Sequence, residues 1–425
     1  MNHTISFICE FILAGLIIYN LVSAYLKYDK ALIWSPITTI SLTYVYYCSI
    51  PFWGGGVSKL FAFDEDLCDG YLFHIAAIVS YVFIMIGFYT TKNERREFKL
   101  WNSALTKQTL GMYGLILFII AILGYSSVRG FHVSIAYEDN IGTQISTGGF
   151  TYYFVMLLDM MPFVCALLLM SVKNGKYRFL CLFLIVILFI QLIVSGARWR
   201  IVVASIAMLS VYYLYPKVKK ANLIVIGVLG ALLFFAFSIM DHTRVRSGGI
   251  RMDVAQELTY EDVKSGANEN YVVYRFSMLC MNNINTTGER IYFLPELTAI
   301  LMPIPRALFP WKPDAAYIHK IEQNVGLSGG AAFLNFVESF YSFGWIGVAV
   351  LGWFLGWLSR RFWDNYSHNR DSLGAIVALA IYSGVCYMII SRGFIASSLT
   401  TYLLSLCLPF WIILMIRHRK KEDRK

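Results

Sequence analysis

Charged residues are scarce in this chain of 425 residues: they make up 15% of it, compared with roughly 25% in soluble domains. Its eight cysteines show no metal-ligand spacing and no CxxC pair, so metal and dithiol chemistry have no sequence signature here. Low-complexity segments and a convincing internal repeat are also missing. The absent repeat disfavours secondary transporters, because many of these are built from two related halves.

Apolar residues are abundant instead, at 58% of the chain with a mean hydropathy of +0.59. They form runs of about 20 residues, the length that crosses a bilayer core. The first run lacks a cationic start and a cleavage site, so we interpret it as a retained helix. We predict an all-α polytopic membrane protein with about eleven transmembrane helices, at residues 5–25, 33–52, 71–89, 110–124, 152–171, 179–194, 201–215, 223–240, 333–358, 373–390 and 397–415.

The basic residues predict which way these helices run. Lys and Arg collect in cytoplasmic loops, which accounts for the formal charge of +10 without any nucleic-acid partner. If the N-terminus lies outside, every predicted inner segment is basic, and the acidic loop 64–69 lies outside. The inner segments are residues 27–30, 92–107, 173–178, 217–220, 360–370 and the tail 417–425.

This topology divides the chain into three parts. Residues 1–240 carry helices one to eight, residues 241–332 form a large outer loop, and residues 333–425 carry the last three helices and the basic tail. Within the loop we expect short helices at 253–263 and 271–281, and an apolar stretch at 297–304 that follows the membrane surface or re-enters it. Cys68 and Cys280 both map outside and could pair, although nothing in the sequence requires it.

Arginine dominates the outer cations. Of 36 basic residues, the topology places 13 Lys and 9 Arg inside but 4 Lys and 10 Arg outside. The guanidinium fork grips phosphate oxygens at two points, so outward Arg residues indicate phosphate contacts. The alternative is that these side chains merely snorkel at the membrane interface. The candidates are Arg198, Arg200, Arg244, Arg246, Arg306, Lys312 and Arg392.

Glu338 is the candidate reactive carboxylate. It lies about one turn into an otherwise apolar helix, and Asn335, Tyr341 and Ser342 lie at helical spacing from it, giving a polar stripe. A carboxylate at membrane depth is costly and is functional by default. The alternative is an acidic residue that favours the N-terminal end of the helix dipole.

One stretch of the chain resembles a known family. The segments Ile304-Pro305-Arg306, Pro310, Lys312-Pro313 and Gly329-Gly330, followed by Glu338, Phe343-Gly344 and Gly347, resemble the C-terminal signature of Wzy-type O-antigen and oligosaccharide repeat-unit polymerases. Ser195-Gly196-Ala197-Arg198 is similar to a turn of the same family. The sequence departs from the family pattern at Ser342, where Asn is usual, and at Phe340, where Tyr is usual; Tyr341 lies one residue on.

The resemblance implies an integral-membrane glycosyltransferase of the GT-C type in the bacterial inner membrane, with its active site facing the periplasm. It would transfer a glycan from undecaprenyl pyrophosphate to an incoming lipid-linked repeat unit. Glu338 would be the general base, and the outer cations with Tyr341 would bind the pyrophosphate and glycan without a metal or other cofactor. The implied partners are the lipid-linked oligosaccharide, membrane lipids and a chain-length regulator protein.

Three alternatives remain open at this point. An O-antigen ligase shares the architecture and the donor, and would use a loop histidine such as His242 or His319. A lipid-linked oligosaccharide flippase predicts similar halves, short loops and cations deep in the membrane. A membrane acyltransferase would need a buried histidine with an Asp or Asn partner, and we identify none from the sequence.

Overall fold

The protein is described by a computed structural model, and the residues it describes are almost all helical. They confirm an all-α membrane protein, with one minimal antiparallel pair of two-residue strands, β1 (Arg244–Val245) and β2 (Gly249–Ile250). The described residues are 2–27, 30–53, 70–91, parts of 111–123, 161–171, 175–194, 198–215, 244–245, 249–250, 269–301, 309–311, 332–393 and 395.

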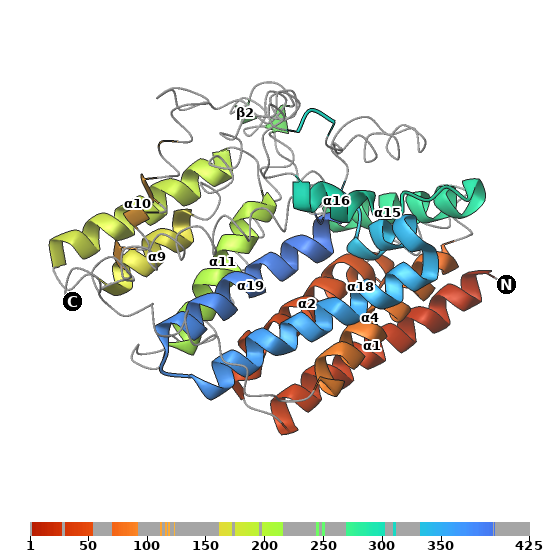
Figure 1. The fold of residues 1–425 in the computed structure, drawn as a ribbon, viewed down its shortest axis with the longest axis horizontal. Coiled ribbons are helices and arrows are strands. Elements are labelled where there is room, and N and C mark those ends of the chain that lie inside the picture. The colour runs from red at the N-terminus through yellow and green to blue at the C-terminus, as the bar shows by residue number, and fades with distance from the viewer. Residues whose placement is uncertain are drawn as a thin grey trace.

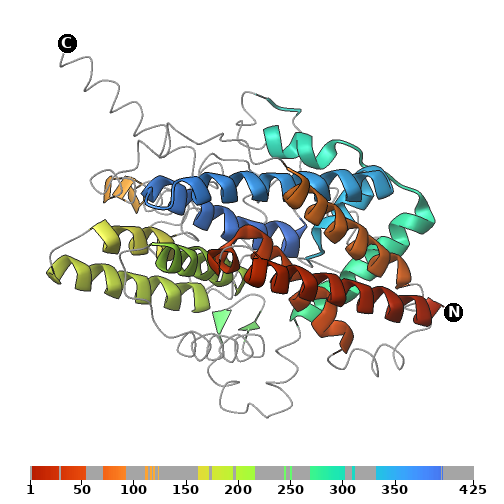
Figure 2. The same cartoon turned by 90° about the horizontal axis from the view of Figure 1, so that it is seen from below.

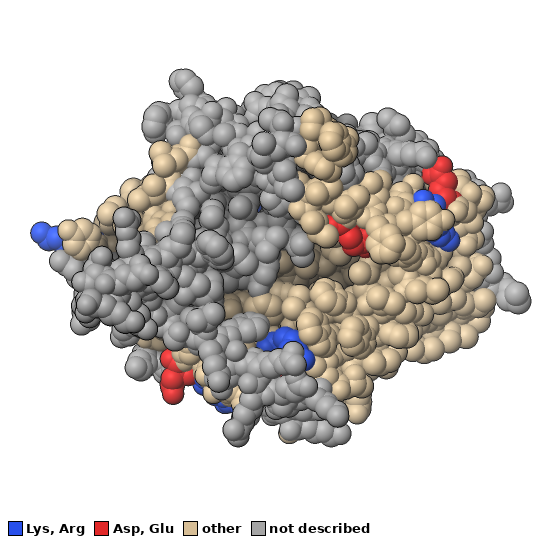
Figure 3. Space-filling view, viewed as in Figure 1, with Lys and Arg blue, Asp and Glu red and all other residues tan. Residues whose placement is uncertain are grey.

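Four described helices are long and apolar enough to cross a membrane. They are α1 (Asn2–Lys27), α4 (Tyr71–Thr90), α18 (Asn335–His368) and α19 (Leu373–Arg392). They run side by side in both views (Figures 1 and 2). The described surface in Figure 3 is mostly uncharged, as a lipid-facing surface requires. The membrane-protein prediction is therefore confirmed, whereas the number of eleven spans stays a prediction, because the spans at 223–240 and 397–415 and much of those at 110–124 and 152–171 lie outside the described residues.

A second group of helices lies on the other side of α19 (Figure 1). It comprises α9 (Met161–Ser171), α10 (Gly175–Val194) and α11 (Arg198–Leu214). α11 packs against both α9 and α19. Because α19 lies between α11, α2 and α18, nearly all of its side chains are buried. α19 is therefore the central helix of the described bundle.

The predicted span at 33–52 is not one regular helix. It begins as the 3₁₀ helix η1 (Lys30–Trp34), continues as α2 (Pro36–Tyr44) and widens into the π-turn η2 (Val45–Ser49). Pro36 fits the first turn of α2, where its missing N–H costs nothing. The π-turn carries the carbonyl of Tyr46, which accepts a hydrogen bond from Asn270 at 3.1 Å. A helix of the large loop therefore contacts the bundle at this irregularity.

α18 packs tightly on α4 and then bends. Gly352 and Gly356 lie against the backbone of Ser80 and Ile84, where a side chain would collide. This spacing of small residues allows close helix approach in membranes. The bend lies at Phe343 and Gly344, and Gly344 has a φ of +61°, which glycine adopts without strain. The predicted span at 333–358 is therefore a longer, bent helix.

Residues 241–332, the predicted large loop, include two described helices that cover one end of the bundle. α15 (Glu269–Thr287) contacts η2, α4 and α18, and α16 (Leu294–Leu301) contacts α18. The predicted helix at 271–281 is thus confirmed and is longer, whereas 253–263 lies outside the described residues. α16 is described as far as Leu301, two residues before Pro303. We call the end covered by α15 the loop end.

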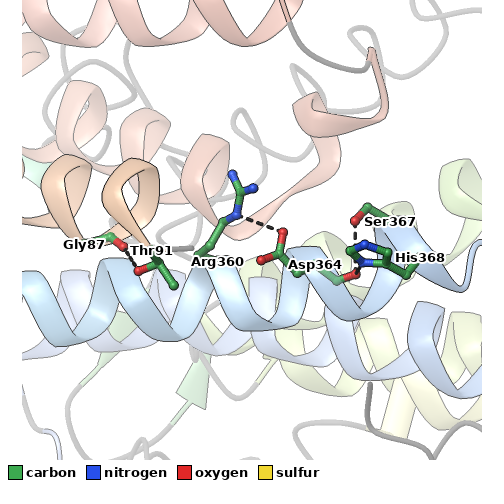
Figure 4. A network of polar contacts seen from close by, with 6 residues as sticks. All are labelled: Gly87, Thr91, Arg360, Asp364, Ser367 and His368. Atoms are coloured by element: carbon green, nitrogen blue, oxygen red, sulfur yellow. Dashed lines mark hydrogen bonds and ion pairs between the residues drawn. The ribbon is translucent and has the colours of Figure 1, made fainter. Parts of the chain in front are cut away.

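The opposite end carries its own polar network. The Nε of Arg360 lies 2.8 Å from Asp364 Oδ1, and the carbonyl of Asp364 accepts from Ser367 Oγ at 3.0 Å (Figure 4). The Arg360 guanidinium also lies 5.5 Å from the ring centre of Phe88. Arg360 belongs to the predicted inner segment 360–370, and the orientation of this end in the membrane stays a prediction.

Candidate functional site

Three helix ends meet at the loop end of the bundle. α18 begins there with Asn335, α19 ends there with Arg392, and α11 begins there with Arg198. α18 and α11 both pack against α19, so their ends are held close to its C-terminus. The candidate site consists of Glu338 from α18, Arg392 from α19, and Trp199 and Arg200 from α11.

Glu338 is buried, as predicted, with 3% of its side chain exposed. Its Oε2 accepts a hydrogen bond from the backbone N–H of Ile395 at 3.1 Å. Ile395 follows α19, whose C-cap residue, Gly393, has a left-handed φ of +52°. Gly393 lies against Phe333, and a Cβ there would collide with the Phe333 ring. Glycine therefore allows the end of α19 to dock on the start of α18, where Glu338 holds it.

Trp199 brings two of the predicted arginines together. The Arg200 guanidinium carbon lies 5.1 Å from the Trp199 ring centre, and that of Arg392 lies 5.9 Å from it. Both distances are within the range of cation–π contact. Arg392 also suits the negative C-terminal end of α19, but Arg200 sits at the positive N-terminal end of α11. The Trp199 indole therefore contacts two guanidinium groups, one from α11 and one from α19.

Arg200 is more buried than a side chain that snorkels at the membrane interface would be. It lies in the first turn of α11 with 7% of its side chain exposed. The span predicted at 201–215 therefore begins three residues earlier, at Arg198, so Trp199 and Arg200 belong to its first turn. A buried cation is stable only when it is compensated by other groups, so Arg200 is part of the packed structure rather than a snorkelling residue.

Tyr341, predicted to bind the pyrophosphate or glycan, contacts a carboxylate in the structure. Its side chain is buried, and its hydroxyl donates to Glu289 Oε2 at 3.2 Å. Asn335 and Ser342 of the predicted polar stripe are buried as well. Tyr341 therefore links the first turns of α18, through Glu289, to the segment between α15 and α16.

Several predicted site residues cannot be placed at the site. The structure describes the backbone of Arg198, at the start of α11, and of Arg244, in β1, but not their side chains. Arg246, Arg306 and Lys312 lie outside the described residues, as do Cys68, His242 and His319. Cys280 is buried in α15, and its pairing with Cys68 stays untested because Cys68 is not described. Their roles remain predictions.

Sequence reasoning missed a buried polar chain beside the site. His74 Nδ1 lies 3.2 Å from Glu10 Oε2, and its Nε2 lies 3.0 Å from the Tyr274 hydroxyl. Glu10 and His74 are 0% and 2% exposed. A possible signal was Glu10, an acidic residue inside the first apolar run. Finding its partners required the fold, because the three residues come from α1, α4 and α15.

This chain of contacts holds the large loop on the bundle. Tyr274 belongs to α15, and one turn later Ser277 Oγ accepts from the backbone N–H of Leu334 at 3.0 Å. Leu334 immediately precedes α18, which carries Glu338. Because both ring nitrogens of His74 face protein groups, we interpret it as a positioning residue. Its acidic partner is Glu10, and not the Asp or Asn expected of an acyltransferase.

The comparisons with known proteins fit this arrangement. The family model described as "O-antigen polysaccharide polymerase Wzy" matches residues 1–422. The chain belongs to the Wzy O-antigen polysaccharide polymerase family. Membership agrees with the Wzy-like motif around Glu338 and supports a general role in O-antigen polymerisation. No curated protein and no solved structure matches the chain.

Proposed function

We propose that this Wzy family member polymerises undecaprenyl-pyrophosphate-linked oligosaccharide repeat units at the periplasmic face of the bacterial inner membrane, as a GT-C-type glycosyltransferase. The observation that carries the proposal is the meeting of a buried carboxylate, Glu338, with the end of α19, where Arg392 and Arg200 share Trp199. Such a site offers a proton acceptor and cations for a phosphate leaving group.

In the proposed reaction, the carboxylate and the two arginines have different roles. A hydroxyl oxygen of the incoming repeat unit attacks the anomeric carbon of the donor glycan and forms the new glycosidic bond. The bond from that carbon to the phosphate oxygen breaks, and undecaprenyl pyrophosphate leaves with the bonding electrons. Glu338 takes the hydroxyl proton, while Arg392 and Arg200 stabilise the negative charge that develops on the pyrophosphate.

The other predicted cations belong to the same proposal. Arg198, Arg244, Arg246, Arg306 and Lys312 are further contacts to the pyrophosphate or glycan. The charge pattern of the sequence supports a periplasmic site, because the loop end carries the less basic segments. A chain-length regulator is an additional partner that the family resemblance implies.

The test is a gel of product length. Purified protein receives the lipid-linked repeat unit of its own strain, with a chelator and without a nucleotide sugar. A ladder of multiples is the expected result. Unchanged monomer, with folded protein and with a substrate that a reference polymerase consumes, would contradict the proposal. Transfer to lipid A-core would identify a ligase, and movement of the substrate across vesicles without bond formation would identify a flippase.

A further inference from the structure

The segment between α15 and α16, residues 288–293, crosses the bend of α18. The backbone N–H of Ile291 donates to the carbonyl of Tyr341 at 3.1 Å. In a continuous helix that carbonyl would accept from Trp345, which lies beyond the bend. The Tyr341 hydroxyl donates to Glu289 on the same segment. Two hydrogen bonds thus fix the crossing segment at the point where α18 leaves helical geometry.

Tyr292 in this segment has an unusual backbone. Its φ is +48°, and it is the one non-glycine residue with a positive φ in the part of the chain that the structure describes. Side chains other than those of Gly, Asn and Asp adopt this region at a cost, and such costs collect at functional sites. The ring is 61% exposed, so burial does not offset the cost. An exposed tyrosine held in this conformation indicates that its ring is used.

A second exposed ring lies beside it. Phe293 is 69% exposed, and its ring centre lies 4.7 Å from that of Phe343, while the Tyr292 ring centre lies 6.2 Å from Phe343. Tyr292 and Phe293 therefore place two exposed aromatic rings against the ring of Phe343 at the bend. Phe343 is itself one of the two residues that form the bend.

Polar groups border these rings. The Arg290 guanidinium lies 4.9 Å from the Phe340 ring centre and borders Gly344. Its Nη1 donates to the carbonyl of Glu289 at 2.8 Å, and Glu289 presents its carboxylate to Tyr341. Sugars combine a C–H face, which stacks on aromatic rings, with hydroxyl groups, which bond strongly to carboxylates and guanidiniums. The segment offers both kinds of contact.

We propose that Glu289, Arg290, Tyr292 and Phe293 form a glycan-binding site for the oligosaccharide of the lipid-linked substrate. This inference rests on the proposed function. Tyr341, which holds Glu289, lies three residues after Glu338 on α18, so the site follows the reacting carboxylate by about one helical turn, roughly 5 Å. The site holds the sugars next to the one that reacts.

Tyr292→Gly separates this role from a structural one. Glycine suits a positive φ, so the variant keeps or gains thermal stability. Loss of the ring raises the KM for the lipid-linked repeat unit roughly tenfold, the effect expected of one stacking residue. Phe293→Ala gives a similar rise, and Tyr292→Asn replaces Tyr292→Gly if the latter fails to fold. The control is Phe11→Ala, which removes a ring that is 65% exposed on α1.

Binding of the free glycan gives a readout without catalysis. The repeat-unit oligosaccharide, released from its lipid, is added to the purified protein and followed by saturation-transfer NMR. Binding by the wild type and by Phe11→Ala, with loss in Tyr292→Gly and Glu289→Gln, supports the site. Equal binding by all four proteins overturns it. Unchanged glycan binding with weaker partition of the Tyr292 variant into vesicles would also overturn it, because the rings would then be a membrane anchor.

These results distinguish the two proposals. Polymerisation with a normal KM in Tyr292→Gly and Glu289→Gln would contradict the glycan-site proposal but not the polymerase proposal. If the folded protein binds the glycan specifically but makes no ladder of products, the polymerase proposal is contradicted and the glycan-site proposal is supported.

Discussion

Oε2 of Glu338 lies 3.1 Å from the backbone nitrogen of Ile395. This hydrogen bond joins the proposed base to the segment that follows Arg392, the proposed pyrophosphate contact. The positions of the carboxylate and of the guanidinium are therefore coupled through four residues of chain. A purely structural role for Glu338 and a catalytic one predict different results, because only the second needs the carboxylate to accept a proton.

Glu338→Gln and Glu338→Ala separate these roles. The glutamine side-chain oxygen still accepts from Ile395, so the Gln variant keeps the fold and substrate binding. It cannot accept the hydroxyl proton, and kcat for repeat-unit addition falls by about 10²–10⁴-fold, the usual contribution of a general base. The Ala variant loses the hydrogen bond as well, and its melting temperature drops. Kinetics and thermal unfolding in detergent measure the two effects, and a Gln variant with near-normal kcat would leave Glu338 as a structural clamp.

Arg392→Gln and Arg200→Gln test the charge around Trp199. Each variant removes a cation from the proposed leaving-group site, and we expect kcat to fall by about 10²–10³-fold, as for other preorganised electrostatic contacts. The matched control is Arg361→Gln, which removes a guanidinium 5.4 Å from the Trp357 ring centre on α18. Arg361 belongs to a predicted inner segment. Equal losses in the control would mean that Arg–Trp packing, and not the position of the charge, supports activity.

His74→Phe tests the positioning chain behind the site. The ring loses its bonds to Glu10 and Tyr274, so α15 is held less firmly and Cys280, which is buried in α15, becomes more reactive toward maleimide. We expect kcat to fall more than KM rises, because the chain acts through Leu334 on the start of α18. Variants that leave Cys280 as the one cysteine report the labelling rate.

A pH series adds a second readout of the same chain. Burial raises the pKa of Tyr274 well above the tyrosine value of 10.0, and the charge of Glu10 raises it further. Tyr274 favours its neutral form when folded, so this contribution to stability is present below about pH 10 and declines as the pH rises toward the folded pKa. As this stability declines, α15 is held less firmly, so the labelling rate of Cys280 should rise above about pH 10. The Tyr274→Phe variant should lack this rise in labelling rate. Unchanged Cys280 labelling and unchanged kcat in His74→Phe would contradict a positioning role for the Glu10–His74–Tyr274 contacts.

Glu296 on α16 gives a stability prediction with a pH sign. Burial raises its pKa above 4.5, and its Oε2 is buried without a hydrogen-bond partner among the described residues. Folding therefore favours protonated Glu296, and the stability it contributes is lost as the pH rises through its folded pKa. Glu296→Gln should raise the melting temperature at pH 7 by an amount worth about 1 kcal/mol or less, and have little effect at pH 4. An equal shift at both pH values would contradict the assignment.

Regular apolar helices were predictable from the sequence. The prediction for residues 71–89 agrees with α4 (Tyr71–Thr90), and 373–390 agrees with α19 (Leu373–Arg392), because long apolar runs without proline have few alternatives to a membrane helix. The π-turn Val45–Ser49 was not predictable from local pattern. It is supported by distant partners, such as Asn270, which bonds to Tyr46.

The site was predictable where one residue carried the signal. Glu338 stands out as an acid in an apolar run, and it is buried as predicted. Arg200 and Arg392 were predictable as outer cations, but their shared contact with Trp199 depends on the packing of α11 against α19. Glu289 and His74 were missed because their roles depend on contacts with residues far away in sequence. Glu289 contacts Tyr341, and His74 contacts Tyr274.

The most direct test of the central claim counts the carrier lipid released for each bond formed. Purified protein is given the lipid-linked repeat unit, and undecaprenyl pyrophosphate and glycan length are followed together by mass spectrometry. We predict one undecaprenyl pyrophosphate released per repeat unit added, with both signals lost in Glu338→Gln. Chain growth without carrier release, or carrier release without longer glycans, would contradict transfer from a pyrophosphate-linked donor.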